Sequence, residues 1–111
     1  MDSLKGQVAI VTGSATGIGY GIAKRLSEEG ANIVMVDFDP EMAEQSSSEM
    51  AARGTEVEVS VGDVSEPQTA QDAVRKAIDK WGKIDILVNN AGIGGINGNI
   101  CLLYTSDAAD E

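Results

Sequence analysis

The sequence predicts an α/β fold with a doubly wound parallel sheet that is truncated after about four strands. Short apolar runs alternate with amphipathic segments along the chain, as expected for parallel strands joined by crossover helices. A glycine-rich turn at 12–19 follows the first apolar run, and Asp37 ends the second. With the strands in the order 3-2-1-4, counted along the chain, the predicted crevice lies between the first and fourth strands.

The first strand is predicted at 8–11, and the helix after it starts near Ile18 and stops at Gly30. Apolar and small residues recur at helical spacing and predict the face that packs on the sheet. That face comprises Ile18, Gly19, Ile22, Ala23 and Leu26. We expect Gly21 to help the helix lie close to the sheet, as a packing residue and not a ligand contact.

The second strand, at 33–36, precedes a helix that Pro40 opens and that runs to 53–54. Its apolar stripe is weak, so we expect a partly exposed helix in which Met42 and Met50 fill the core.

The third strand, at 56–61, alternates apolar with polar residues. A clean alternation indicates one wet face, so we expect this strand at or near a sheet edge. Glu56 and Glu58 are then predicted to be solvated charges.

A third helix follows, with Ser65 as its expected N-cap and Pro67 in its first turn. It runs to Trp81, which we interpret as a core anchor, and ends at Gly82. The fourth strand is predicted at 84–88.

The turn has the composition of a phosphate cradle. A Cβ at Gly13, Gly17 or Gly19 would block the approach of a pyrophosphate to the N–H groups of a helix start. A glycine cluster also occurs in simple strand-to-helix connections, so the interpretation depends on Asp37. That acid lies about twenty residues on, where dinucleotide folds bind the adenosine ribose.

The residues around Asp37 favour NAD(H) over NADP(H). A carboxylate accepts from the ribose hydroxyls and repels a 2′-phosphate, no Lys or Arg lies within 12–19, and Phe38 follows the acid. The alternative is that Asp37 only caps the strand or starts a turn with Asp39 and Pro40.

Three motifs together resemble the short-chain dehydrogenase/reductase family over about residues 4–96. They are Thr12-Gly13-Ser14-Ala15-Thr16-Gly17-Ile18-Gly19, Asp63-Val64, and Asn89-Asn90-Ala91-Gly92 after Ile84-Asp85-Ile86-Leu87-Val88. The resemblance implies a Rossmann-type domain, here partial, that binds NAD, with NADP less favoured.

The resemblance also implies which residues contact the cofactor. It places the turn on the pyrophosphate, Asp37 on the adenosine ribose, the second motif on the adenine and the third on the ribose of the nicotinamide half. The implied residues are Gly13, Ser14, Thr16, Gly17, Ile18, Gly19, Asp37, Asp63, Val64, Asn90, Ala91 and Gly92. Two alternatives stay open: the asparagines tie neighbouring strands together, and Asp63 is only a loop acid.

The activity implied by the family is hydride transfer between nicotinamide and a secondary alcohol or ketone, as in a sugar-acid or polyol dehydrogenase or a 3-oxoacyl reductase. The family's catalytic Ser and Tyr-x-x-x-Lys are not in this chain: no lysine follows Lys83, and Ala108 stands four places after Tyr104. A phenol without a neighbouring ammonium lacks the group that would lower its pKa. We therefore assign no catalytic residue and predict that the 111-residue fragment is inactive; the alternative is a non-catalytic dinucleotide-binding or sensor protein.

Residues 101–111 show neither strand alternation nor a helical stripe. They resemble a translated sequencing adapter, so we expect a partial domain at 1–100 and a non-native tail after it.

The composition limits the classes of partner that the chain is expected to bind. A formal net charge of −10 disfavours nucleic acid and anionic membranes, and neither a signal peptide nor a run of eighteen apolar residues is visible. We expect a cytoplasmic protein whose intact parent acts on a small alcohol or ketone as a homo-oligomer. The chain has one cysteine and no histidine, which excludes an internal disulfide, a serine-type triad and histidine metal sites.

Overall fold

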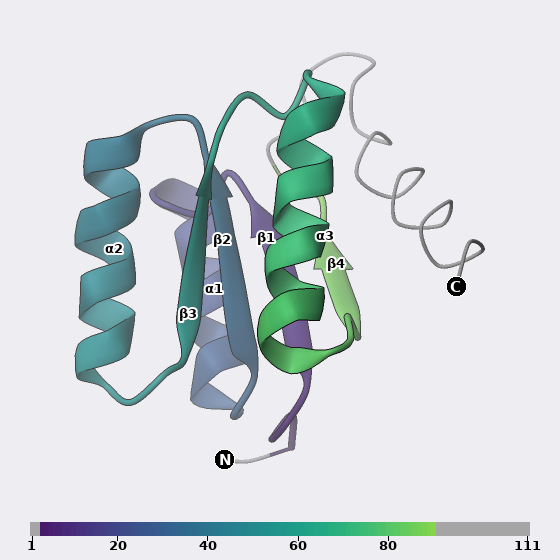
Figure 1. The fold of residues 1–111 in the computed structure, drawn as a ribbon. Helices are drawn as coiled ribbons and strands as arrows, with labels where there is room; N and C mark the ends of the chain where they lie inside the picture. The colour runs from purple at the N-terminus through teal and green to yellow at the C-terminus, as the bar shows by residue number, and fades with distance from the viewer. Residues whose placement is uncertain (1–2, 91–111) are drawn as a thin grey trace.

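The computed structural model describes residues 3–90, which form a single parallel sheet with helices on both faces (Figure 1). The elements are β1 Val8–Thr12, α1 Gly17–Glu28, β2 Asn32–Asp37, α2 Pro40–Ala52, β3 Val57–Val61, α3 Pro67–Trp81 and β4 Ile86–Val88. The strand order is β3-β2-β1-β4, and each neighbouring pair is parallel. The predicted topology is confirmed, with element ends displaced by a residue or two.

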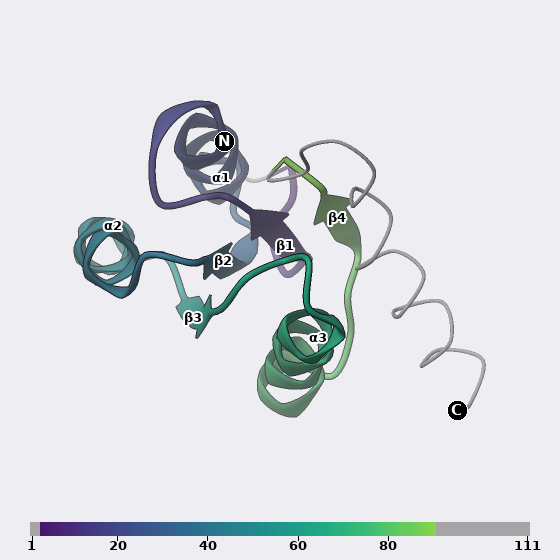
Figure 2. The same ribbon diagram turned by 90° about the horizontal axis from the view of Figure 1, so that it is seen from above.

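The sheet separates two layers of helices. Seen from above, α1 and α2 cover one face and α3 the other (Figure 2). Side chains of the central strands alternate between the two sides: Ala9 and Val11 join the core under α1 and α2, while Val8 and Ile10 join the core under α3. All five residues of β1 are buried, because a strand covered on both faces has no wet side.

No helix within residues 3–90 is long and apolar enough to cross a membrane.

The strand β3 lies at a sheet edge, as its alternation predicted. Glu56 is exposed and Glu58 is half-buried, in agreement with the predicted solvated charges, and both also have a partner at the end of α3. The indole Nε1 of Trp81 donates to Glu56 Oε1 at 3.1 Å, and Lys80 Nζ lies 3.7 Å from Glu58 Oε2. Trp81 also packs against the core under α3, in agreement with the anchor role.

The face of α1 that packs on the sheet is narrower than predicted. Gly19 and Ala23 are buried and Ile22 and Leu26 pack beside them, but Ile18 is 77% exposed. Gly21 is exposed, and a Cβ built on it meets nothing within 4 Å. The predicted packing role of Gly21 was wrong because it lies two positions from both buried residues, about 200° around the helix.

The helix starts differ in how they are capped. Asp39 caps α2 by accepting from the N–H groups of Glu41 and Met42. The cap position of α3 is Glu66, without a side-chain bond. The prediction of Ser65 as its N-cap was therefore wrong, since the backbone leaves the extended conformation one residue later.

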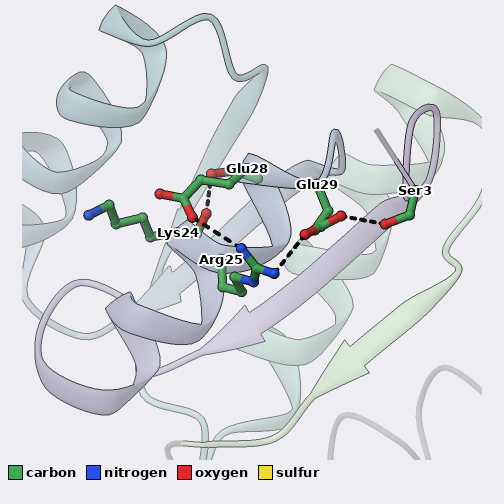
Figure 3. Close-up of polar contacts among 6 residues, drawn as sticks. Ser3, Lys24, Arg25, Glu28 and Glu29 are labelled. Carbon is green, nitrogen blue, oxygen red and sulfur yellow. Dashed lines mark hydrogen bonds and ion pairs between the residues drawn. The ribbon is translucent and has the colours of Figure 1, made fainter. Parts of the chain in front are cut away.

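The end of α1 holds the segment that leads into β1 (Figure 3). The Ser3 hydroxyl donates to the Glu29 carboxylate, and Leu4 N–H donates to Glu29 O at 2.8 Å. The Ser3 bond is the main cause of a lowered Glu29 pKa, and Arg25 lies 2.9 Å from the same carboxylate. These contacts lie where the strands begin, away from their carboxyl ends.

Asp85 aligns the start of β4 with β1. Its N–H donates to Val8 O, and its Oδ2 accepts from Val8 N–H, both at 2.8 Å. Lys83 Nζ is 3.1 Å from the same carboxylate. The bond from Val8 N–H is the main cause that holds the Asp85 pKa below its ordinary value. Burial raises this pKa, and Lys83 lowers it further.

We predict that Asp85→Asn lowers the free energy of unfolding at neutral pH by about 1 kcal/mol, since a charge-assisted bond becomes a neutral one. The folded-state pKa lies below the unfolded value of about 3.9. The wild-type advantage is therefore fully present above about pH 4 and is lost as the pH falls through the folded pKa. Urea unfolding of both proteins at pH 7 and near pH 3 measures this, and an equal difference at the two pH values would contradict it.

Candidate cofactor-binding site

The carboxyl ends of three strands bring the predicted site residues together. The glycine-rich turn follows β1, Asp37 ends β2, and Asn89 and Asn90 follow β4 (Figure 1). Open parallel sheets bind ligands at this edge, where the strand order reverses.

The glycines of the turn are needed for different structural reasons. Gly13 and Gly17 have φ of 60° and 63°, which favour glycine. A Cβ on Gly17 meets nothing within 4 Å, so the space beside it is open to a ligand. A Cβ on Gly19 would lie 1.9 Å from Gly13 O and 2.6 Å from Asn90 Nδ2. The predicted reason for Gly19 was therefore incomplete: the chain itself already requires glycine there.

The turn is attached to β2 through its own N–H groups. Gly13 and Ser14 donate to Val36 O at 2.8 and 3.3 Å, and Ala15 donates to Asp37 Oδ2 at 3.0 Å. These three donors are committed within the protein. An anion bound at the turn therefore depends on the donors that follow them.

Those donors are the first N–H groups of α1. The helix begins at Gly17 after an extended Thr16, and no side chain caps it. The first-turn N–H groups have no partner inside a helix and lie at the positive end of its dipole. The start of α3 also lacks a side-chain cap, so it is the position of α1 beside Asp37 and Asn90 that distinguishes this start.

The Ser14 side chain is buried at the turn. The residue is fully buried, and its Oγ has no hydrogen-bond partner among residues 3–90. Its N–H donates to Val36 O in β2, so the hydroxyl is the donor of Ser14 that is left for a ligand.

Asp37 has the turn role that the sequence offered as the alternative, and it keeps acceptor sites for a ligand. It is 8% exposed, its Oδ2 accepts from Ala15 N–H, and its Oδ1 accepts from Asp39 N–H at 3.1 Å. The turn role is thus present in the structure. Each carboxylate oxygen accepts two hydrogen bonds, so one site on each remains for ribose hydroxyls. Phe38, beside it, is 77% exposed.

Asp63 and Val64 follow β3 at the same edge. Asp63 Oδ1 accepts from Ser65 N–H at 2.9 Å and from Ser65 Oγ at 2.8 Å. These two bonds lower the Asp63 pKa, and the bond from the backbone N–H has the larger effect. Asp63 is exposed, and Val64 packs against the core under α3. The loop-acid role is present, and Asp63 Oδ2 faces no bonded donor among the described residues.

The asparagines after β4 tie strands together. Asn90 Nδ2 donates to Gly13 O at 3.3 Å, and Thr12 Oγ1 lies 3.4 Å from both Asn89 Oδ1 and Val88 O. This agrees with the structural alternative. Ala91 and Gly92, like the tail at 101–111, lie outside the described residues.

Tyr20 is the one tyrosine among residues 3–90. The phenol of Tyr20 lies between α1 and α2, where it donates to Glu49 Oε1 at 2.8 Å and accepts from Arg53 Nη2 at 3.2 Å. Burial is the main cause that raises the Tyr20 pKa, and the Glu49 bond adds to it. Within residues 3–90, no three His, Cys, Asp or Glu side chains are grouped to hold a metal ion.

One contact at the turn had no signal in the sequence. Ser46 Oγ, from α2, donates to Ala15 O at 2.5 Å. The two residues are 31 positions apart, and no local pattern links them.

Comparisons with known proteins agree with this geometry. A family model described as short chain dehydrogenase matches residues 7–109. The oxidoreductase UcpA of Escherichia coli is 42% identical over 93 residues, which cover 84% of this chain and 35% of that protein. A (2S)-[(R)-hydroxy(phenyl)methyl]succinyl-CoA dehydrogenase subunit of Thauera aromatica is 41% identical over 90 residues, 81% of this chain and 36% of that one. The chain spans about a third of the length of these relatives.

Solved structures share the fold. L-sorbose reductase from Gluconobacter frateurii, complexed with NADPH and L-sorbose, matches with a TM-score of 0.79 and 36% identity over 86% of this chain and 37% of that one. A short chain dehydrogenase/reductase from Burkholderia phymatum in complex with NAD matches with a TM-score of 0.79 and 32% identity, over 85% and 34%.

We predict opposite effects for two glycine substitutions in α1. Gly19→Ala forces the helix start away from Gly13 O and Asn90, so it lowers the free energy of unfolding by several kcal/mol, of the order of a severe packing error (~3 kcal/mol). Gly21→Ala has open space and a helical backbone, so it raises that free energy by about 0.5–1 kcal/mol. Urea unfolding measures both, and equal effects would contradict the assignment.

Proposed function

The chain belongs to the short-chain dehydrogenase family, and we propose that residues 1–100 are the cofactor-binding part of a longer NAD-dependent oxidoreductase. The observation that supports this best is the convergence of three features at one sheet edge. These are the uncapped start of α1, the carboxylate of Asp37 and the amide of Asn90.

The described residues fit a dinucleotide. Gly17 and the first turn of α1 would hold the pyrophosphate, since the space beside Gly17 is open and the N–H groups there are uncapped. Asp37 would accept from the adenosine ribose. Asp63 and Val64 would border the adenine, and the segment from Asn90 to Gly92 the nicotinamide ribose. The bound nicotinamide supplies the hydride chemistry.

The preference for NAD is argued from charge. A 2′-phosphate on the adenosine ribose would lie against the Asp37 carboxylate, and the exposed neighbour is Phe38 instead of a cation. Proteins that share this fold bind either cofactor: the L-sorbose reductase binds NADPH and the Burkholderia phymatum protein binds NAD.

For the substrate we propose a secondary alcohol or ketone, such as a sugar acid, polyol or 3-oxoacyl compound. The relatives that support this are a (2S)-[(R)-hydroxy(phenyl)methyl]succinyl-CoA dehydrogenase subunit and an L-sorbose reductase. The acid/base residue, a Tyr assisted by a Lys, and the Ser that holds the substrate oxygen would come from beyond residue 100. This chain then binds and orients the cofactor, and is inactive alone.

We propose further that the intact protein is a cytoplasmic homo-oligomer and that residues 101–111 are a non-native tail. The tail proposal rests on the adapter-like sequence alone, and the family match itself runs to residue 109.

Sequencing of the source locus without adapters, across the codon for Ile100, tests the enzyme proposal. We expect the frame to continue into a Ser and a Tyr-x-x-x-Lys. The encoded protein should then reduce NAD with a secondary alcohol, measured by absorbance of NADH. A gene that ends at Glu111 would overturn it and favour the alternative, a dinucleotide-binding or sensor protein, which NAD titration then tests.

We predict that Asp37→Ala in the intact protein lowers the preference for NAD over NADP by roughly tenfold, since charge-assisted bonds to the ribose are lost and repulsion of the 2′-phosphate is removed. The ratio of dissociation constants for NAD and NADP measures this. Asp39→Ala is the control, because it removes an equal charge and the cap of α2 but no ribose contact. An unchanged ratio in Asp37→Ala would show that this acid does not select the cofactor.

A further inference from the structure

One face of α2 contacts the glycine-rich turn and the start of α1. Ser46 and Glu49 are three positions apart on α2, and Arg53, the C-cap residue, follows at i+7 on the same side. Ser46 bonds to Ala15 in the turn, whereas Glu49 and Arg53 both bond to Tyr20 in α1. A helix that carries no predicted cofactor contact thus holds both parts of the proposed pyrophosphate site.

The Ser46 bond is unusual for a helix serine. Serines inside helices commonly donate to a carbonyl of the preceding turn, and both Ser27 and Ser47 donate to the carbonyl three residues back, Lys24 O and Glu44 O. Ser46 is instead 7% exposed and donates to Ala15 O, 31 residues away. Its hydroxyl therefore serves tertiary structure.

The bond completes the fixation of Ala15. This residue is 3% exposed, and its buried carbonyl needs a donor. Ser46 supplies it, while Asp37 accepts from the N–H of the same residue. Because both the N–H and the carbonyl of Ala15 are bonded, the direction in which the chain enters Thr16 and Gly17 is fixed.

We propose that Ser46 is a positioning residue, which holds the glycine-rich turn from behind so that the first N–H groups of α1 are oriented for the pyrophosphate. This inference rests on the proposed dinucleotide function. Ser46 itself does not touch the cofactor. It acts by preorganisation, which improves binding because less ordering remains to be done when the ligand arrives.

The mode of action separates Ser46 from Asp37. The pyrophosphate is common to NAD and NADP, so a change at Ser46 alters the affinity for both equally. Asp37 faces the ribose, where the two cofactors differ. The ratio of the two affinities therefore distinguishes a positioning residue from a specificity residue.

The test compares Ser46→Ala with Ser47→Ala in the full-length protein. Both variants remove one helix hydroxyl and gain the same helix propensity, but only the first breaks the bond to the turn. We expect Ser46→Ala to raise the KM for both dinucleotides about three- to tenfold, the value of one hydrogen bond. We expect kcat and the NAD/NADP ratio to stay as in wild type. Ser47→Ala should match wild type throughout.

Amide hydrogen exchange of residues 13–17 without cofactor gives a second readout. We expect faster exchange in Ser46→Ala than in Ser47→Ala. If Ser46→Ala aggregates, Ser46→Cys keeps most of the volume with a weaker donor and serves in its place.

A KM for Ser46→Ala equal to that of Ser47→Ala, or an altered NAD/NADP ratio, would overturn the positioning role. A wild-type protein that binds neither dinucleotide would instead overturn the proposed function. The two failures are therefore distinguishable.

Discussion

The site depends on one close approach, between the start of α1 and the ends of two strands. A Cβ on Gly19 would fall 1.9 Å from the carbonyl oxygen of Gly13 and 2.6 Å from the amide of Asn90. Because that space is empty of side chain, the first turn of α1 lies directly over the end of β1, and Asn90 can donate to Gly13 O. The close approach of Gly19 to Gly13 O thus fixes how α1 lies over the turn, and it leaves room for the bond that connects Asn90, after β4, to the turn.

Several polar groups at this edge have structural partners in addition to the ligand contacts proposed for them. Asp37 holds Ala15 N–H and begins its own turn, and Asn90 holds Gly13 O. The structural and functional interpretations of these residues therefore do not compete. A carboxylate has about four acceptor sites, so two backbone bonds leave room for ribose hydroxyls and hold the carboxylate in one orientation.

The sequence was sufficient for the order of strands and helices, since apolar runs and glycines are local signals, but it misplaced the cap of α3 by one residue. Helical periodicity did not predict burial correctly where burial depends on the orientation of the helix on the sheet. Ile18 has the spacing of a core residue, but in the first turn of α1 it is 77% exposed. Among the candidate site residues, the placement of Asp37 and the glycines at one sheet edge was predictable because a dinucleotide site needs them at a fixed spacing. Ser46 was not, because its partner is 31 residues away and the sequence around it resembles any exposed serine run.

In the proposed function an acidic chain binds an anionic cofactor, which requires an attraction that does not depend on the net charge. The turn at 12–19 contains no charged side chain, and the nearest cations along α1, Lys24 and Arg25, are seven and eight residues past Gly17, about 10 Å along the helix. Charges at that distance are largely screened at physiological salt. The attraction for a pyrophosphate therefore has to be local, from backbone N–H groups and the end of one helix dipole. Backbone N–H groups attract the anion only while they point at it. The affinity for a pyrophosphate therefore depends more on the contacts that hold the turn than on the net charge of −10.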